Sequence, residues 1–134
     1  MNDNQPTTTL DTALMDAVVK ELTAEMLRRL ENIDPSDDPY AEYGECWERG
    51  SYSSDDALYL EGEFEDYEIG YEFEISWRYR EWTEYWTDPV CYPSFSEMDD
   101  EKGEVYNITI IDPDGNELPE EYCKEIAERV NKAI

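Results

Sequence analysis

Apolar and charged residues alternate along residues 58–86, and the alternation changes phase partway. The apolar positions are even from Leu58 to Phe64 and odd from Tyr67 to Tyr79. Because alternate residues of a strand face opposite sides, one uninterrupted strand would leave half of these apolar side chains in water. A hairpin with a two-residue connection at Glu65-Asp66 would keep both sets on one face, and we predict this hairpin. A bulge or a longer loop near residues 66–70 would give a similar result.

The predicted hairpin gathers carboxylates on its opposite, solvent-facing side, together with two tryptophans near the end of its second strand. Tyrosine and tryptophan are enriched at protein interfaces, and most of the aromatic residues lie between Tyr40 and Phe95. Two interpretations of the tryptophans stay open: they contact a partner, or they pack under residues 87–103. The candidate partner-binding residues are Glu61, Glu63, Glu68, Glu72, Glu74, Trp82 and Trp86.

Helical spacing of apolar residues predicts one helix near each end of the chain. Leu14, Val18, Leu22 and Met26 repeat at intervals of four within residues 10–31. Residues 1–9 are polar, so we predict a flexible N-terminus followed by a single α+β domain over residues 10–134. The closing helix begins near Pro119 and carries Tyr122, Ile126 and Val130 at the same interval.

The remaining segments predict short strands, turns and a loop. Residues 46–52 favour a short strand, and the Ser-Ser-Asp-Asp of residues 53–56 is typical of a turn. Residues 87–103 predict a loop, because they contain two prolines and an acidic cluster. Residues 104–111 are rich in β-branched side chains and predict a strand. The predicted fold is therefore α+β: an N-terminal helix, an antiparallel meander of three to four strands with a long central hairpin, and a C-terminal helix packed on one sheet face.

The charge narrows the classes of partner. Ten Lys and Arg against 36 Asp and Glu give a formal net charge of −26, concentrated in residues 32–104. Such a field repels nucleic acid and anionic membranes and attracts basic surfaces. We therefore expect no direct nucleic-acid binding and no membrane binding. The alternative interpretation is that the acidic surface only keeps the protein in solution.

No catalytic signature stands out in the chain. There is no histidine, no glycine-rich phosphate loop and no GxSxG, and the abundance of carboxylates makes any single pair uninformative. The three cysteines are widely spaced, which does not favour a zinc site. Asp112-Pro-Asp-Gly superficially resembles the start of a calcium loop but lacks its ligand spacing, so a turn is favoured. We expect no enzymatic activity, no cofactor and no metal.

The segment EVYNITIIDPDGNELPEEYCKEIAERVNKAI, residues 104–134, and the aromatic-rich hairpin before it resemble small acidic uncharacterised proteins of prophages and conjugative elements. The shared pattern is a hydrophobic strand, a D-x-D-G-N turn and an amphipathic helix, over residues 58–134. The resemblance carries over no activity and no site residue. It implies a context, namely an accessory protein of a mobile element.

These observations lead to one expected function and one alternative. We expect a non-enzymatic accessory or inhibitory protein that binds a protein with a basic surface, such as a nucleic-acid-binding enzyme, and that could act as a DNA mimic. The alternative is an acidic chaperone or scaffold that works through an apolar dimeric surface, so a homo-oligomer stays open. The N-terminus lacks the positively charged segment of a signal peptide, which favours the cytoplasm.

Overall fold

The computed structural model describes residues 4–84 and 93–134 and confirms the α+β fold. Helix α1 (Asn4–Glu31) precedes strands β1 (Glu48–Leu58), β2 (Glu68–Thr83) and β3 (Ser94–Ile111), and helix α2 (Glu120–Ala133) follows them. The strands form a three-stranded antiparallel sheet in the order β1-β2-β3. Two short 3-10 turns, η1 (Pro35–Asp37) and η2 (Gly62–Phe64), lie in the connections before and after β1.

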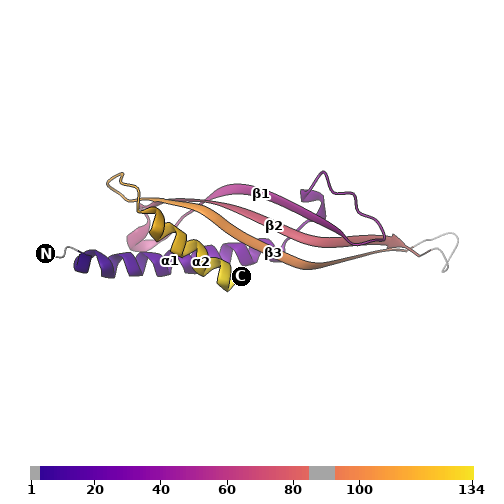
Figure 1. Cartoon of the computed structure of the whole chain (residues 1–134), viewed down its shortest axis with the longest axis horizontal. Coiled ribbons are helices and arrows are strands. Elements are labelled where there is room, and N and C mark those ends of the chain that lie inside the picture. Colours follow the sequence, from indigo (N-terminus) through magenta and orange to yellow (C-terminus); the bar gives the residue numbers. More distant parts are fainter. Residues whose placement is uncertain (1–3, 85–92) are drawn as a thin grey trace.

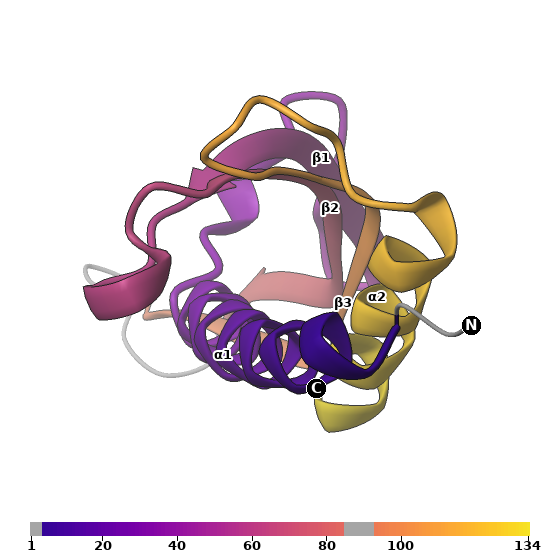
Figure 2. The ribbon, with the colours of Figure 1, turned by 90° about the vertical axis from the view of Figure 1, so that its left-hand side faces the viewer.

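Both helices lie on one side of the sheet, and the β2–β3 hairpin projects beyond them (Figure 1). Viewed end-on, the sheet curves around α1, with α2 beside β3 (Figure 2). The apolar stripe of α1 and the odd positions of β2 meet in the core between these layers. Its largest fully buried side chains include Leu14, Leu22, Met26, Phe73, Ile75, Trp77, Ile110 and Ile126.

The β1–β2 hairpin exists, but its predicted two-residue turn, and the register that this turn implies, are wrong. Leu58 pairs with Ile69, and residues 59–67 form the connection, which includes η2. Even positions of β1 still pair with odd positions of β2 and face the same side of the sheet. The change of phase in the sequence is therefore caused by the reversal of the chain between the two strands, as predicted. The longer connection folds Leu60 and Phe64 into the core and leaves Glu63 in solvent. A two-residue turn would instead have placed Glu63 directly opposite another glutamate, and the longer connection avoids this repulsion.

Strand β1 is longer than predicted, because residues 53–56 continue the strand instead of turning. It is an edge strand, and a solvated edge tolerates serine and aspartate. Two of its backbone N–H groups are capped by carboxylates. Asp38 Oδ2 accepts from the N–H of Ser51 at 2.9 Å, and Asp56 Oδ1 accepts from the N–H of Ala57 at 2.8 Å.

Strand β3 also begins earlier than predicted, so the predicted loop is wrong for residues 94–103; residues 87–92 lie outside the described residues. Two register shifts interrupt its pairing with β2, between Gly70 and Glu72 and between Ser76 and Arg78. Each coincides with a residue of positive φ on β3, Asn107 at 50° and Asp100 at 53°. These bulges change which parity faces the core, and they bend and twist the strand.

We predict that Asn107→Val lowers the free energy of unfolding by about 1–3 kcal/mol, because a β-branched residue is strained at positive φ. The same change also removes the hydrogen bond of 2.6 Å from Asn107 Nδ2 to Glu72 Oε2. Asn107→Gly should cost less, since glycine adopts this conformation without strain. The measurement is urea unfolding. Thr109→Val is the matched control on the same strand, and an equal loss in both valine variants would contradict the bulge.

Helix α1 begins at Asn4, before the predicted start at residue 10. Pro6 is compatible with this start, because the first turn of a helix has no hydrogen-bond acceptor for its N–H groups. At the other end of α1, Arg29 reaches the sheet. Its Nη2 lies 2.7 Å from Asp56 Oδ2 and 2.8 Å from the Tyr71 hydroxyl, and its guanidinium carbon lies 4.1 Å from the centre of the Phe73 ring.

Helix α2 packs against β3, and the side chain of Asn131 is hydrogen-bonded to the backbone of the strand. Asn131 Oδ1 accepts from the N–H of Val105 at 2.8 Å, and Asn131 Nδ2 donates to the carbonyl of Val105 at 3.0 Å. The side-chain amide therefore occupies the place that a neighbouring strand would take. The helix buries Cys123, Ile126 and Val130 beneath this contact.

Candidate protein-binding face

The face of the sheet turned away from the helices divides into two halves of different chemistry. One half, which we call the acidic half, consists of Asp55, Glu68, Glu72, Glu74 and Glu104. The other, which we call the arginine half, consists of Trp47, Arg49, Arg78, Arg80, Trp82, Phe95, Glu97 and Asp99. The even positions of β2 run through both halves, so one strand presents carboxylates first and arginines afterwards.

The acidic half places like charges directly opposite each other. Asp55 on β1 pairs with Glu72 on β2, and Glu74 on β2 pairs with Glu104 on β3. In the described part of the chain, the ion pairs of this face join residues of the arginine half, or Asp100 and Lys102 next to it. Opposed like charges destabilise a sheet, so this arrangement weakens the free protein.

The candidate residues from the sequence fall into three places. Glu68, Glu72 and Glu74 lie on the acidic half of β2, as their parity predicted. Glu61 and Glu63 are exposed but lie in the connection around η2 instead of on a strand. Trp82 belongs to the arginine half, and Trp86 lies outside the described residues.

Trp82 is half-buried in a stack of aromatic rings and guanidinium groups. Its ring stacks on Phe95 of β3 with centroids 5.7 Å apart, and the guanidinium carbon of Arg80 lies 4.8 Å from the Trp82 ring centre. Trp47 lies just before β1. The guanidinium carbons of Arg80 and Arg78 lie 4.9 Å and 4.8 Å from the centre of its ring. Cation–π contacts of this kind explain why a tryptophan can lie on the polar parity of β2.

The arginines of this half are ion-paired with the carboxylates of β3. Arg78 donates two hydrogen bonds to Asp99, at 2.9 and 2.8 Å, and Arg80 donates one to Glu97 at 3.0 Å. The hydrogen bonds from Arg78 lower the pKa of Asp99, and Asp99 in turn raises the pKa of Arg78. Arg49 reaches across β2, donating to the Ser76 hydroxyl and to Asp100, so one side chain links β1 to β3.

Sequence reasoning missed the arginine half, because residues 94–103 were taken as a loop and no partner strand was expected beside Arg78 and Arg80. One signal was present. Glu97 and Asp99 have the same two-residue spacing as Arg78 and Arg80, which is the spacing of neighbours on one face of a strand.

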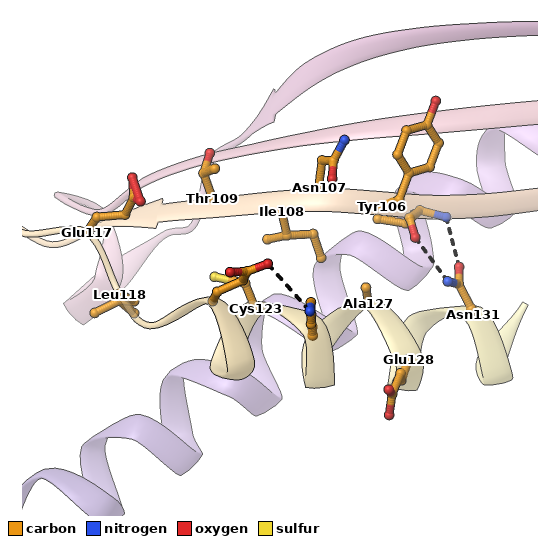
Figure 3. Close-up of a pocket in the computed structure, with 13 residues that line it drawn as sticks. Tyr106, Asn107, Ile108, Thr109, Glu117, Leu118, Cys123, Ala127, Glu128 and Asn131 are labelled. Atoms are coloured by element: carbon orange, nitrogen blue, oxygen red, sulfur yellow. Dashed lines mark hydrogen bonds and ion pairs between the residues drawn. The ribbon is translucent and has the colours of Figure 1, made fainter.

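A groove of about 580 Å³ lies between β3 and α2 (Figure 3). Val105, Ile108, Cys123 and Ala127 supply apolar lining, and Lys124 at its side forms an ion pair of 3.4 Å with Glu120. Burial raises the pKa of the Cys123 thiol, so this cysteine is not activated as a nucleophile. The groove therefore offers shape and apolar surface.

Within residues 4–84 and 93–134, no three Asp, Glu or Cys side chains come together as ligands for a metal ion. In the same ranges, no helix combines the length and the apolar character that a membrane span requires. The turn at residues 112–116 explains the calcium-like spacing, because Asp112 Oδ1 accepts the N–H groups of Asp114 and Asn116.

Comparison with known proteins adds no relative: no protein family, no curated protein and no solved structure matches this chain.

Proposed function

We propose that this chain is a non-enzymatic accessory or inhibitory protein that binds a basic protein surface through the acidic half of its sheet. The observation that supports this most directly is the pairing of Asp55 with Glu72 and of Glu74 with Glu104. The free protein keeps these like charges face to face at a cost in stability. A partner that places cations between them would relieve the repulsion, so the same residues that weaken the fold would strengthen the complex.

The spacing of the carboxylates suits a partner that binds nucleic acid. Same-face residues of a strand recur about every 6.6 Å, and neighbouring strands lie about 4.8 Å apart. Duplex DNA presents one phosphate per about 3.4 Å of rise on each strand, so a groove built for DNA is lined with closely spaced cations. A sheet with rows of carboxylates could occupy such a groove. We therefore favour a nucleic-acid-binding enzyme as the partner, in the setting of a mobile element.

The test removes three carboxylates of the acidic half. We expect Glu72→Gln, Glu74→Gln and Glu104→Gln together to lower the capture of DNA-binding proteins from a host lysate by at least about tenfold, since each close charge pair contributes strongly to such interfaces. Captured proteins should be displaced by duplex DNA. They should also be released as the salt concentration rises, because salt screens exposed charges.

The matched control has the same net charge but leaves the acidic half intact. It carries Glu31→Gln, Glu121→Gln and Glu128→Gln, three exposed carboxylates on the helices. The control should keep its partners. An equal loss of capture in both triple variants would contradict a site on the sheet, and capture that ignores both salt and DNA would contradict the mimic. Urea unfolding checks folding, and the sheet variant should be the more stable one because it loses its like-charge contacts.

A further inference from the structure

We infer that the arginine half is an interface for a second copy of this chain. This goes beyond the proposed function, which uses the acidic half. Tryptophan and arginine are among the residues that most often dominate the binding energy of interfaces. The arginine half contains two tryptophans and three arginines. Phe95 at its edge remains 43% exposed, although it stacks on Trp82.

The local charge explains why the partner is a second copy instead of another acidic or basic protein. The chain as a whole carries −26, so two copies repel each other over most of their surfaces. Each arginine of the arginine half forms an ion pair with a carboxylate of β3. The three carboxylates are Glu97, Asp99 and Asp100. With Asp100 and Lys102 included, this part of the surface has four cations against three carboxylates. It therefore lacks the strong negative charge of the rest of the chain, and a copy can approach it at the smallest electrostatic cost.

The arrangement of the charges is also complementary to itself. Arg78 and Arg80 form a column on β2, and Asp99 and Glu97 form a parallel column on β3. A two-fold axis parallel to the strands and between these columns places the arginines of one copy against the carboxylates of the other. Symmetric dimers are built from such self-matching surfaces. The four side chains are still 34–47% exposed, so each can contact a partner while keeping its own ion pair.

The same symmetry brings the two acidic halves to one end of the dimer. Their repulsion opposes association at low salt and is screened as salt rises. We therefore expect the monomer to predominate at low salt and the dimer to form as sodium chloride is added. This dependence is opposite to the one expected for binding a basic partner, which weakens with salt. The two proposals can thus fail independently.

The experiment is sedimentation equilibrium of the full chain over a salt series. Arg80→Glu and Glu97→Arg, each alone, should lower the dimerisation constant by at least about tenfold, because each brings like charges together across the axis. An equimolar mixture of the two variants should recover the dimer, since the introduced carboxylate of one copy then meets the introduced guanidinium of the other. Recovery in the mixture also shows that both variants fold.

Two further variants locate the interface. Phe95→Ser should weaken the dimer, whereas Tyr59→Ser, at a residue that is 84% exposed outside the arginine half, should leave it unchanged. A monomer at every salt concentration would overturn the inference. A dimer that the single charge reversals do not weaken, or that the mixture does not restore, would place the interface elsewhere and would also overturn it.

Discussion

Replacing Gly50 with alanine should lower the free energy of unfolding by about 3–5 kcal/mol, a loss composed of overpacking and a disrupted, partly buried hydrogen bond. Gly50 lies on the core face of β1, directly opposite Trp77 of β2. A Cβ at this position would lie 2.6 Å from Nε1 and 2.7 Å from Cε2 of the Trp77 ring, and it would also meet the Tyr43 hydroxyl. Trp77 is fully buried and has no free space into which it could move.

The substitution that disturbs the packing of Trp77 also disrupts its hydrogen bond to Tyr43. Trp77 Nε1 donates to the Tyr43 hydroxyl at 2.8 Å, and that hydroxyl donates to the carbonyl of Pro35 at 3.1 Å. Displacing either ring therefore also detaches the connection between α1 and β1. Urea unfolding followed by tryptophan fluorescence measures the effect. Gly44→Ala is the matched control, since a Cβ there meets no atom within 4 Å, and similar losses in both variants would contradict the packing described.

The second large effect is expected at Arg29. Arg29→Ala should lower the free energy of unfolding by about 2–4 kcal/mol, because it uncovers the Phe73 ring, removes the cation paired with Asp56 and removes the donor to the Tyr71 hydroxyl. Arg28→Ala is the matched control. Arg28 is 61% exposed and pairs with Glu25 one turn earlier, so its loss should be below about 0.5 kcal/mol. Equal effects of the two substitutions in urea unfolding would contradict the contact between α1 and the sheet.

The same contact predicts a pH dependence. The pKa of Asp56 is lowered first by the N–H of Ala57 and then by Arg29. Because the folded pKa lies below the unfolded one, this contribution to stability is present above the unfolded pKa and is lost as pH falls through the folded pKa. Unfolding measured from about pH 7 down to about pH 3 should therefore lose less stability in Arg29→Ala than in the wild type. An unchanged acid dependence in the variant would mean that the N–H of Ala57 alone sets this pKa.

The parts of the fold that sequence predicted well are those where a single periodicity runs unbroken. The four-residue repeats of α1 and α2 placed Leu22 and Ile126 correctly in the core. Parity also located the carboxylates of β2 on the outer face. In each case one face is apolar and the other polar, so the pattern determines the orientation.

The parts that sequence missed are those where the local pattern is interrupted or reversed by tertiary contacts. Strand β1 contains Ser-Ser-Asp-Asp, a turn-like run that the sheet accommodates because Asp56 binds Arg29 of a distant helix. Strand β3 changes parity at Asp100 and Asn107, so its apolar positions do not alternate along the sequence. The arginine half depends on both strands, which is why Arg78 and Arg80 could not be assigned partners from the sequence.

The carboxylate caps on β1 have a consequence for how the protein behaves in bulk. Ser51 and Ala57 lie on the parity whose backbone groups point away from β2, and their N–H groups are already bound to Asp38 and Asp56. An incoming strand would find these two N–H groups already bound, which disfavours edge-to-edge pairing along β1. Both caps are carboxylates whose pKa is lowered by these bonds, so the protection persists into mildly acidic solution, where the net charge that keeps the chains apart is already declining.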